Sequence, residues 1–273
     1  MSDLILLALD GSTPSQMAAG AAIQIAAERN LLVIGLYVVD EAFISDPRSN
    51  IHAELGTSEV PASKAELVSR FVLQGDRALK WLENNCHTCD VLGSNNVLFG
   101  GVTETIIQEA DRAMLIGLGR RGHGHADDPT HLGLNFLSIA MHTKKPLLVG
   151  GDDLRPIKRV LVAYRGGSQS QETLDWASRF YHMLNTELVI LVVEEDRPSR
   201  SDEPAQLDQR GLAGYRIIRR IGQPAAEIAR MAEETQSDLI IMGRYRQSTL
   251  MEWQIGSVPD QVLRETKMPV LIV

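Results

Sequence analysis

Three residues near the end of the chain have the types and spacing of a phosphate-binding loop. Gly243 follows an apolar run, and Gly256 and Ser257 come 13 residues later, at the expected start of a helix. Glycine lets the backbone approach an anion closely, and the first-turn N–H groups of a helix can donate hydrogen bonds to it. The hydroxyl of Ser257 adds one more donor. This segment therefore predicts a site for phosphate.

A second group of polar residues lies in the run GHGHADDPTH, which begins at Gly122. Imidazole and carboxylate groups at such short spacing can coordinate zinc, magnesium or another divalent ion. The alternative is a polar loop whose histidines are solvated. The candidate metal ligands are His123, His125, Asp127 and His131.

Cys86 and Cys89 form a C-x-x-C pair, a spacing found in redox sites and in zinc sites. They lie at the end of an expected helix and the sequence has no second such pair, so two cysteines packed at a helix end is the plainer alternative. The sequence also lacks the G-x-S-x-G and G-x-x-x-x-G-K-[ST] motifs of hydrolases and P-loop ATPases. Ligand binding or sensing therefore fits better than catalysis, and slow ATP hydrolysis is the enzymatic alternative.

The chain repeats itself. The run LILLALDGSTPS from Leu4 aligns with RVLVAYRGGSQS from Arg159, and KKPLLVG near residue 147 aligns with KMPVLIV at the end of the chain. Self-similarity over this length indicates two copies of one domain. We place the domains at residues 1–150 and 156–273, with 151–155 as the linker.

Each half alternates apolar runs of strand length with amphipathic segments of helix length. Runs rich in Val, Ile and Leu are typical of parallel strands covered on both faces, which are joined by right-handed crossovers. The predicted fold is α/β, with two tandem open five-stranded parallel sheets flanked by helices. The strands are expected near residues 4–9, 31–38, 90–99, 113–117 and 146–149, and again near 158–164, 187–193, 215–221, 239–243 and 269–273.

The composition excludes several classes of protein. A net charge of −8 argues against nucleic acid or an anionic membrane as the main partner. No apolar run approaches the roughly 20 residues that span a bilayer, and the first residues do not read as a secretory signal. Two cysteines cannot form a disulfide scaffold, which fits a reducing compartment. The sequence therefore predicts a cytoplasmic protein.

The repeat and the Gly243…Gly256-Ser257 pattern resemble the universal stress protein family, as a tandem of two domains covering nearly the whole chain. The resemblance implies a Rossmann-like fold of the adenine nucleotide alpha hydrolase-like type. It also implies binding of ATP or a related adenine nucleotide by members with the full glycine pattern. In such members an Asp after the first strand, a backbone position after the second and the glycine loop surround the nucleotide. By register, the first two positions are Asp10 and Val38 in half one.

The glycine pattern is altered differently in each half. Half one keeps Asp10 but has Gly133 and Leu134 where Gly-Ser is expected, whereas half two has Arg165 in place of the Asp. Arg246 stands at the middle glycine of half two, where a guanidinium either binds phosphate or fills the cavity. We expect the nucleotide, most simply ATP, in half two. Its candidate residues are Ala163, Arg165, Val193, Gly243, Arg244, Arg246, Gly256, Ser257 and Val258.

The resemblance has a further implication for assembly, because domains of this family often pair their last strands edge to edge. We therefore expect an intramolecular pseudo-dimer through Leu147–Val149 and Val270–Val273, which would cover two apolar edges. A homodimer of the whole chain is an additional hypothesis. The expected function is a stress-response protein that senses an adenine nucleotide without efficient catalysis. The alternative is a nucleotide-free interaction scaffold with degenerate pockets, holding metal through its histidine loop.

Overall fold

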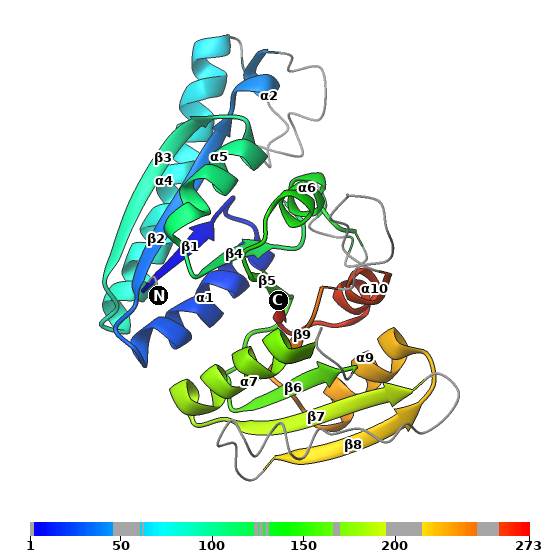
Figure 1. Cartoon of the computed structure of the whole chain (residues 1–273). Coiled ribbons are helices and arrows are strands. Elements are labelled where there is room, and N and C mark those ends of the chain that lie inside the picture. Colours follow the sequence, from blue (N-terminus) through cyan, green and yellow to red (C-terminus); the bar gives the residue numbers. More distant parts are fainter. Residues whose placement is uncertain are drawn as a thin grey trace. The chain divides into compact units, whose positions relative to one another are not determined.

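The computed structural model describes most of the chain, namely residues 3–45, 61, 63–122, 125, 128, 131–165, 170–194, 215–244 and 257–273. It divides into two compact units, unit 1 (Met1–Asp152) and unit 2 (Asp153–Val273). Each unit is a parallel sheet flanked by helices (Figure 1). The α/β fold class predicted from the sequence is confirmed.

The sheet of unit 1 has the strand order β3-β2-β1-β4-β5, with every neighbouring pair parallel. The central strands are almost wholly buried, because helices cover both faces and apolar side chains must fill both. The strands are β1 (Leu4–Ala8), β2 (Leu32–Asp40), β3 (Gly93–Gly100), β4 (Leu115–Gly119) and β5 (Leu147–Gly150).

Helices α1 and α4 of unit 1 pack together on one face of its sheet, and α5 and α6 pack together on the other (Figure 1). Small buried residues such as Ala18 and Ala22 let α1 lie close to β4 and β5. In the described part of the chain, no helix has both the length and the apolar character needed to cross a membrane. The helices are α1 (Thr13–Ala27), α2 (Glu41–Ser45), α4 (Lys64–Thr88), α5 (Val102–Glu109), the 3₁₀ turn η1 (Ala110–Arg112) and α6 (Leu134–His142).

The sheet of unit 2 has the strand order β8-β7-β6-β9-β10, which is equivalent to that of unit 1, and its neighbouring strands are again parallel. Helices α9 and α10 pack against each other, and α7 packs on β6 and β9. Half one carries α4 between its second and third strands, whereas the matching residues 195–214 of half two lie outside the described part of the chain. The elements are β6 (Arg159–Tyr164), α7 (Gln171–Leu184), β7 (Glu187–Glu194), β8 (Arg216–Ile221), α9 (Pro224–Glu234), β9 (Leu239–Met242), α10 (Ser257–Glu265) and β10 (Val270–Ile272).

Candidate ligand-binding site

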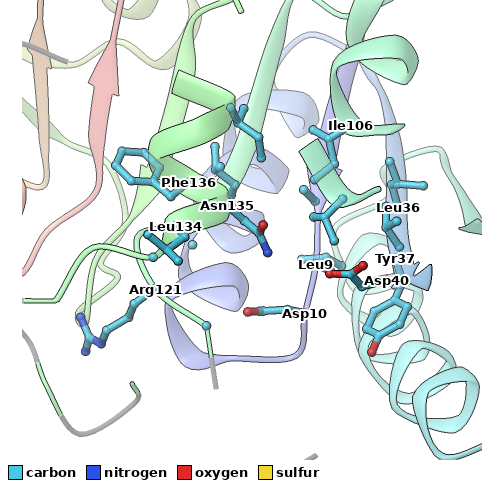
Figure 2. A pocket seen from close by; sticks show the side chains of 18 of the residues that line it. Leu9, Asp10, Leu36, Tyr37, Asp40, Ile106, Arg121, Leu134, Asn135 and Phe136 are labelled. Atoms are coloured by element: carbon cyan, nitrogen blue, oxygen red, sulfur yellow. The ribbon is translucent and has the colours of Figure 1, made fainter. Parts of the chain in front are cut away.

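A cavity of about 330 Å³ opens in unit 1 where β1, β2 and β4 end (Figure 2). Its walls come from these strand ends, from α2, α4 and α5, and from the first turn of α6. Strand β1 lies between β2 and β4, so the chain order reverses at this point. Open parallel sheets bind their ligands at such a reversal, beyond the carboxyl ends of the strands.

Asp10 enters this cavity in a fixed orientation. Its Oδ1 accepts hydrogen bonds from the backbone N–H of Ser12 at 2.9 Å and from the Ser12 hydroxyl at 2.6 Å. Gln74 Nε2 on α4 donates to the Asp10 carbonyl at 3.2 Å. The turn passes through Gly11 at φ +84°, a conformation that favours glycine. With Oδ1 occupied, Oδ2 is the carboxylate oxygen that remains for a ligand.

The wall built from β2, α2 and α4 combines aromatic rings with a second carboxylate. Val38 lines this wall from within β2. The strand continues to Asp40, two residues past its predicted end. Asp40 Oδ1 accepts from the N–H groups of Ala42 at 2.9 Å and Phe43 at 3.3 Å, and so caps α2. The rings of Phe43 and Phe71 meet edge to face with centroids 5.6 Å apart. This wall therefore offers flat apolar surface beside a hydrogen-bond acceptor.

The opposite wall is formed by the end of β4 and the start of α6. Helix α6 begins after Gly133, and no side chain caps its first N–H groups. The Asn135 amide points toward the cavity (Figure 2). Leu134 occupies the position expected for serine and is 81% exposed, so this turn has no hydroxyl donor. The described first turn of α6 can receive an anion through its backbone N–H groups and the Asn135 amide.

Two consecutive arginines, Arg120 and Arg121, follow β4 and are almost fully buried. Arg120 Nε donates to the Gly150 carbonyl at 3.1 Å, and Arg121 Nη2 forms an ion pair with Asp152. Burial lowers the pKa of Arg120 to about 10, opposed by the Asp152 carboxylate, which raises it. The Arg121 guanidinium is turned away from Asp10 (Figure 2). Both guanidinium groups therefore contact groups of the protein itself, the Gly150 carbonyl and the Asp152 carboxylate.

The structure describes only part of the proposed metal site. His125 and His131 line the cavity, and their rings stack with centroids 3.6 Å apart. His123 and Asp127 lie outside the described residues. Among the histidine, cysteine, aspartate and glutamate side chains that are described, no group of three is placed to hold a metal ion. The metal site stays a prediction.

Several of the candidate residues of half two lie at the carboxyl ends of the unit 2 strands. Ala163 pairs in register with Met242, which directly precedes Gly243. The Arg165 N–H donates to Ser170 Oγ at 3.4 Å, and the Arg244 N–H donates to the Val273 carbonyl at 2.7 Å. Val193 lies within β7, and Ser257 and Val258 begin α10, where only the backbone of Ser257 is described. Arg246 and Gly256 lie outside the described residues.

Much of the cavity wall was not predicted from the sequence, namely Tyr37, Asp40, Phe43, Phe71 and Gln74. One signal could have found Asp40, because it is the first polar residue after the apolar run of β2, as Asp10 is after β1. Phe71 and Gln74 lie on a helix more than thirty residues further along the chain. No local pattern in the sequence separates their side chains from ordinary helix positions.

The two cysteines differ in environment. Cys86 is buried on α4, whereas Cys89 is exposed at the end of that helix, and both are free thiols. Burial, and to a smaller degree the proximity of Cys89, raises the pKa of Cys86 to about 11. A reactive cysteine needs a thiolate near neutral pH, so these features favour packing at the helix end over a redox pair.

We expect iodoacetamide at pH 8 to modify Cys89 and to leave Cys86 unmodified in the folded protein. A pKa near 11 leaves about a hundredfold less thiolate than the ordinary value of 9.0, and burial also blocks access. Intact mass spectrometry over time should show one fast adduct per chain, which Cys89→Ser removes and Cys86→Ser leaves in place. Two adducts forming at similar rates would contradict the assignment.

A five-stranded parallel sheet flanked by helices, with a cavity where its strand order reverses, is typical of a Rossmann-like α/β protein. The sequence profile of the universal stress protein family matches residues 1–149 and 200–273, and the chain belongs to this family.

Individual relatives agree with this assignment. Universal stress protein Slr1230 of Synechocystis is 30% identical over 166 residues, which are 58% of this chain and 56% of that protein. Universal stress protein MJ0577 of Methanocaldococcus jannaschii is 33% identical over 87 residues, 32% of this chain and 53% of that protein. The chain thus spans about half the length of each of these curated relatives. The crystal structure of a universal stress protein from Archaeoglobus fulgidus matches 100% of this chain and 98% of its own, with a TM-score of 0.76 and 19% identity. That likeness shows a shared fold.

Proposed function

We propose that this universal stress protein binds adenine nucleotides and acts as a sensor of them rather than as an efficient enzyme. The observation that carries the proposal is the unit 1 cavity at the reversal of strand order. Asp10 and Val38 line it, and the family resemblance associates these two positions with the nucleotide.

The walls of the unit 1 cavity suit the parts of a nucleotide. Tyr37, Phe43 and Phe71 offer apolar and aromatic surface to a base. The free oxygens of Asp10 and Asp40 can accept hydrogen bonds from ribose hydroxyls or from an exocyclic amine, as acidic residues do in other nucleotide sites. The uncapped first turn of α6 provides N–H donors for a phosphate.

For unit 2 we propose ATP as the ligand. The sequence keeps Gly243, Gly256 and Ser257, and Arg244 and Arg246 add two positive charges to the segment between the glycines. Guanidinium groups bind phosphate bidentately, which favours a ligand with several phosphates. Ala163 and Gly243 support this proposal because they lie at the carboxyl ends of the adjacent strands β6 and β9.

The test is native mass spectrometry of the freshly purified full chain, followed by identification of the small molecules released on denaturation. We expect adenine nucleotide at up to two molecules per chain. Gly122→Val should remove one and Gly256→Val the other, each by lowering affinity at least about tenfold. The reason in unit 1 is that a Cβ on residue 122 would lie 3.2 Å from Asp10 Oδ2, so the valine occupies ligand space.

The matched control is Gly93→Ala, because a Cβ there meets its nearest neighbour, Cys86 Sγ, at an ordinary 3.5 Å and lies outside the cavity. This variant should retain the nucleotide content of the wild type. If the wild type carries no nucleotide and takes up neither added AMP nor added ATP, the proposal is wrong and the nucleotide-free scaffold remains.

A further inference from the structure

The charges around the unit 1 cavity restrict how many phosphate groups its ligand can carry, which the fold alone does not. Asp10 and Asp40 both line it. Arg121 is the only lysine or arginine among the described residues of the wall, and its guanidinium is paired with Asp152 and turned away from Asp10 (Figure 2). The two carboxylates therefore face the ligand without a compensating cation from the described wall.

The stretch of sequence that precedes α6 contains more acidic than basic residues. Between Gly122 and Gly133 the chain carries Asp127 and Asp128, three histidines, and neither lysine nor arginine. This segment therefore offers no permanent positive charge to a chain of phosphates.

The start of α6 can still hold a single phosphate group. Its first-turn N–H groups have no side-chain cap, and the Asn135 amide lies beside them. The favourable field of a helix start falls off within that turn, and Leu134 supplies no hydroxyl. A second or third phosphate would extend past these donors while remaining near the carboxylates.

We propose that the unit 1 cavity selects a nucleoside or a nucleoside monophosphate and discriminates against nucleoside triphosphates. This inference rests on the proposed function and specifies the ligand class of the same site. Carboxylates accept hydrogen bonds from ribose hydroxyls and amines but repel phosphate oxygens, and repulsion between like charges grows as water is excluded. In unit 2 the segment between Gly243 and Gly256 has Arg244 and Arg246 against a single acid, Glu252.

The experiment is titration calorimetry of the full chain with adenosine, AMP and ATP at pH 8, without added divalent metal, at low and high salt. The variants are Asp10→Asn and Asp40→Asn. In each, an amide oxygen can still accept the hydrogen bonds of Ser12 or of Ala42 and Phe43, so the local turn is kept while the charge is lost. A Gly256→Val background removes the contribution expected from unit 2.

In the Gly256→Val background, where unit 2 no longer contributes, adenosine or AMP should bind at least about tenfold more tightly than ATP at low salt, and high salt should reduce this ratio. Each Asn variant should reduce it several-fold. The control is Asp90→Asn, which removes one negative charge of unit 1 outside the cavity, at a left-handed position (φ 55°) that Asn accepts. It should leave the ratio unchanged.

Two results would overturn the inference in distinguishable ways. If ATP binds most tightly to the Gly256→Val protein and the Asn variants in that background do not change the order, charge selection is wrong while nucleotide binding stands. If none of the three compounds binds to any form of the protein, the proposed function fails and the ligand class fails with it.

Discussion

Replacing Gly150 with alanine is expected to destabilise unit 1 by at least about 3 kcal/mol, although the change adds a single methyl group. Gly150 ends β5, where the strand meets the first turns of α1. A Cβ at this position would lie 1.8 Å from the Pro14 carbonyl oxygen and 2.7 Å from the Ala18 nitrogen. Both are backbone atoms of α1, so a change of rotamer cannot relieve the overlap and the helix itself must move.

The displacement of α1 should also weaken ligand binding, because Ser12 precedes this helix and holds the carboxylate of Asp10. Urea unfolding followed by circular dichroism measures the free energy of unfolding. The amount of nucleotide that the purified protein retains measures ligand binding. Gly93→Ala is the matched control, with its nearest contact at 3.5 Å, and should change stability by no more than about 0.5 kcal/mol. A Gly150→Ala protein within about 1 kcal/mol of the wild type would show that β5 and α1 do not approach this closely.

The strands could be predicted well because they are parallel and buried on both faces. Such strands produce uninterrupted apolar runs, and the internal repeat indicates which run of one half corresponds to which run of the other. The first and last residues of the strands are predicted less accurately. Strand β3 begins at Gly93 rather than near residue 90, because Asp90 has φ 55° and belongs to the turn that leaves α4. Strand β2 continues to Asp40, where pairing with Gly100 of β3 extends it.

The cavity could be predicted only where a strand end supplies its wall. Asp10 follows an apolar run directly, so its place in an open sheet follows from the order of the elements. Phe71 and Gln74 reach the cavity through the packing of α4 against β2, which depends on tertiary contacts that one sequence does not specify. The positions of the buried charges could not be predicted either, because Arg120 and Arg121 read as exposed loop residues in the sequence but are buried in the structure. The sequence-based preference for a nucleotide in half two stays a prediction, because much of its glycine loop lies outside the described residues.

Removing the carboxylate of Asp152 is the second change with a large expected effect, a loss of about 2 to 3 kcal/mol in the stability of unit 1. Arg121 is 6% exposed, and in the described structure its Nε and Nη1 have no hydrogen-bond partner, so the ion pair with Asp152 is the interaction that compensates its burial. Arg120 is fully buried, and Asp152 raises the pKa that burial lowers. In Asp152→Asn the Arg121 guanidinium would therefore stay buried without the carboxylate that compensates it, and Arg120 would lose the favourable charge of Asp152.

Asp153→Asn provides a matched control one residue away. Asp153 pairs with Arg155, and the side chains are 45% and 60% exposed, so solvent screens the pair and its loss should cost less than about 1 kcal/mol. Combining Asp152→Asn with Arg121→Met should recover part of the lost stability, because a buried charge is then removed together with its partner. Urea unfolding of the wild type and these three variants tests this. Equal effects of Asp152→Asn and Asp153→Asn, or no recovery in the double variant, would show that the buried arginines do not depend on Asp152 for their compensation.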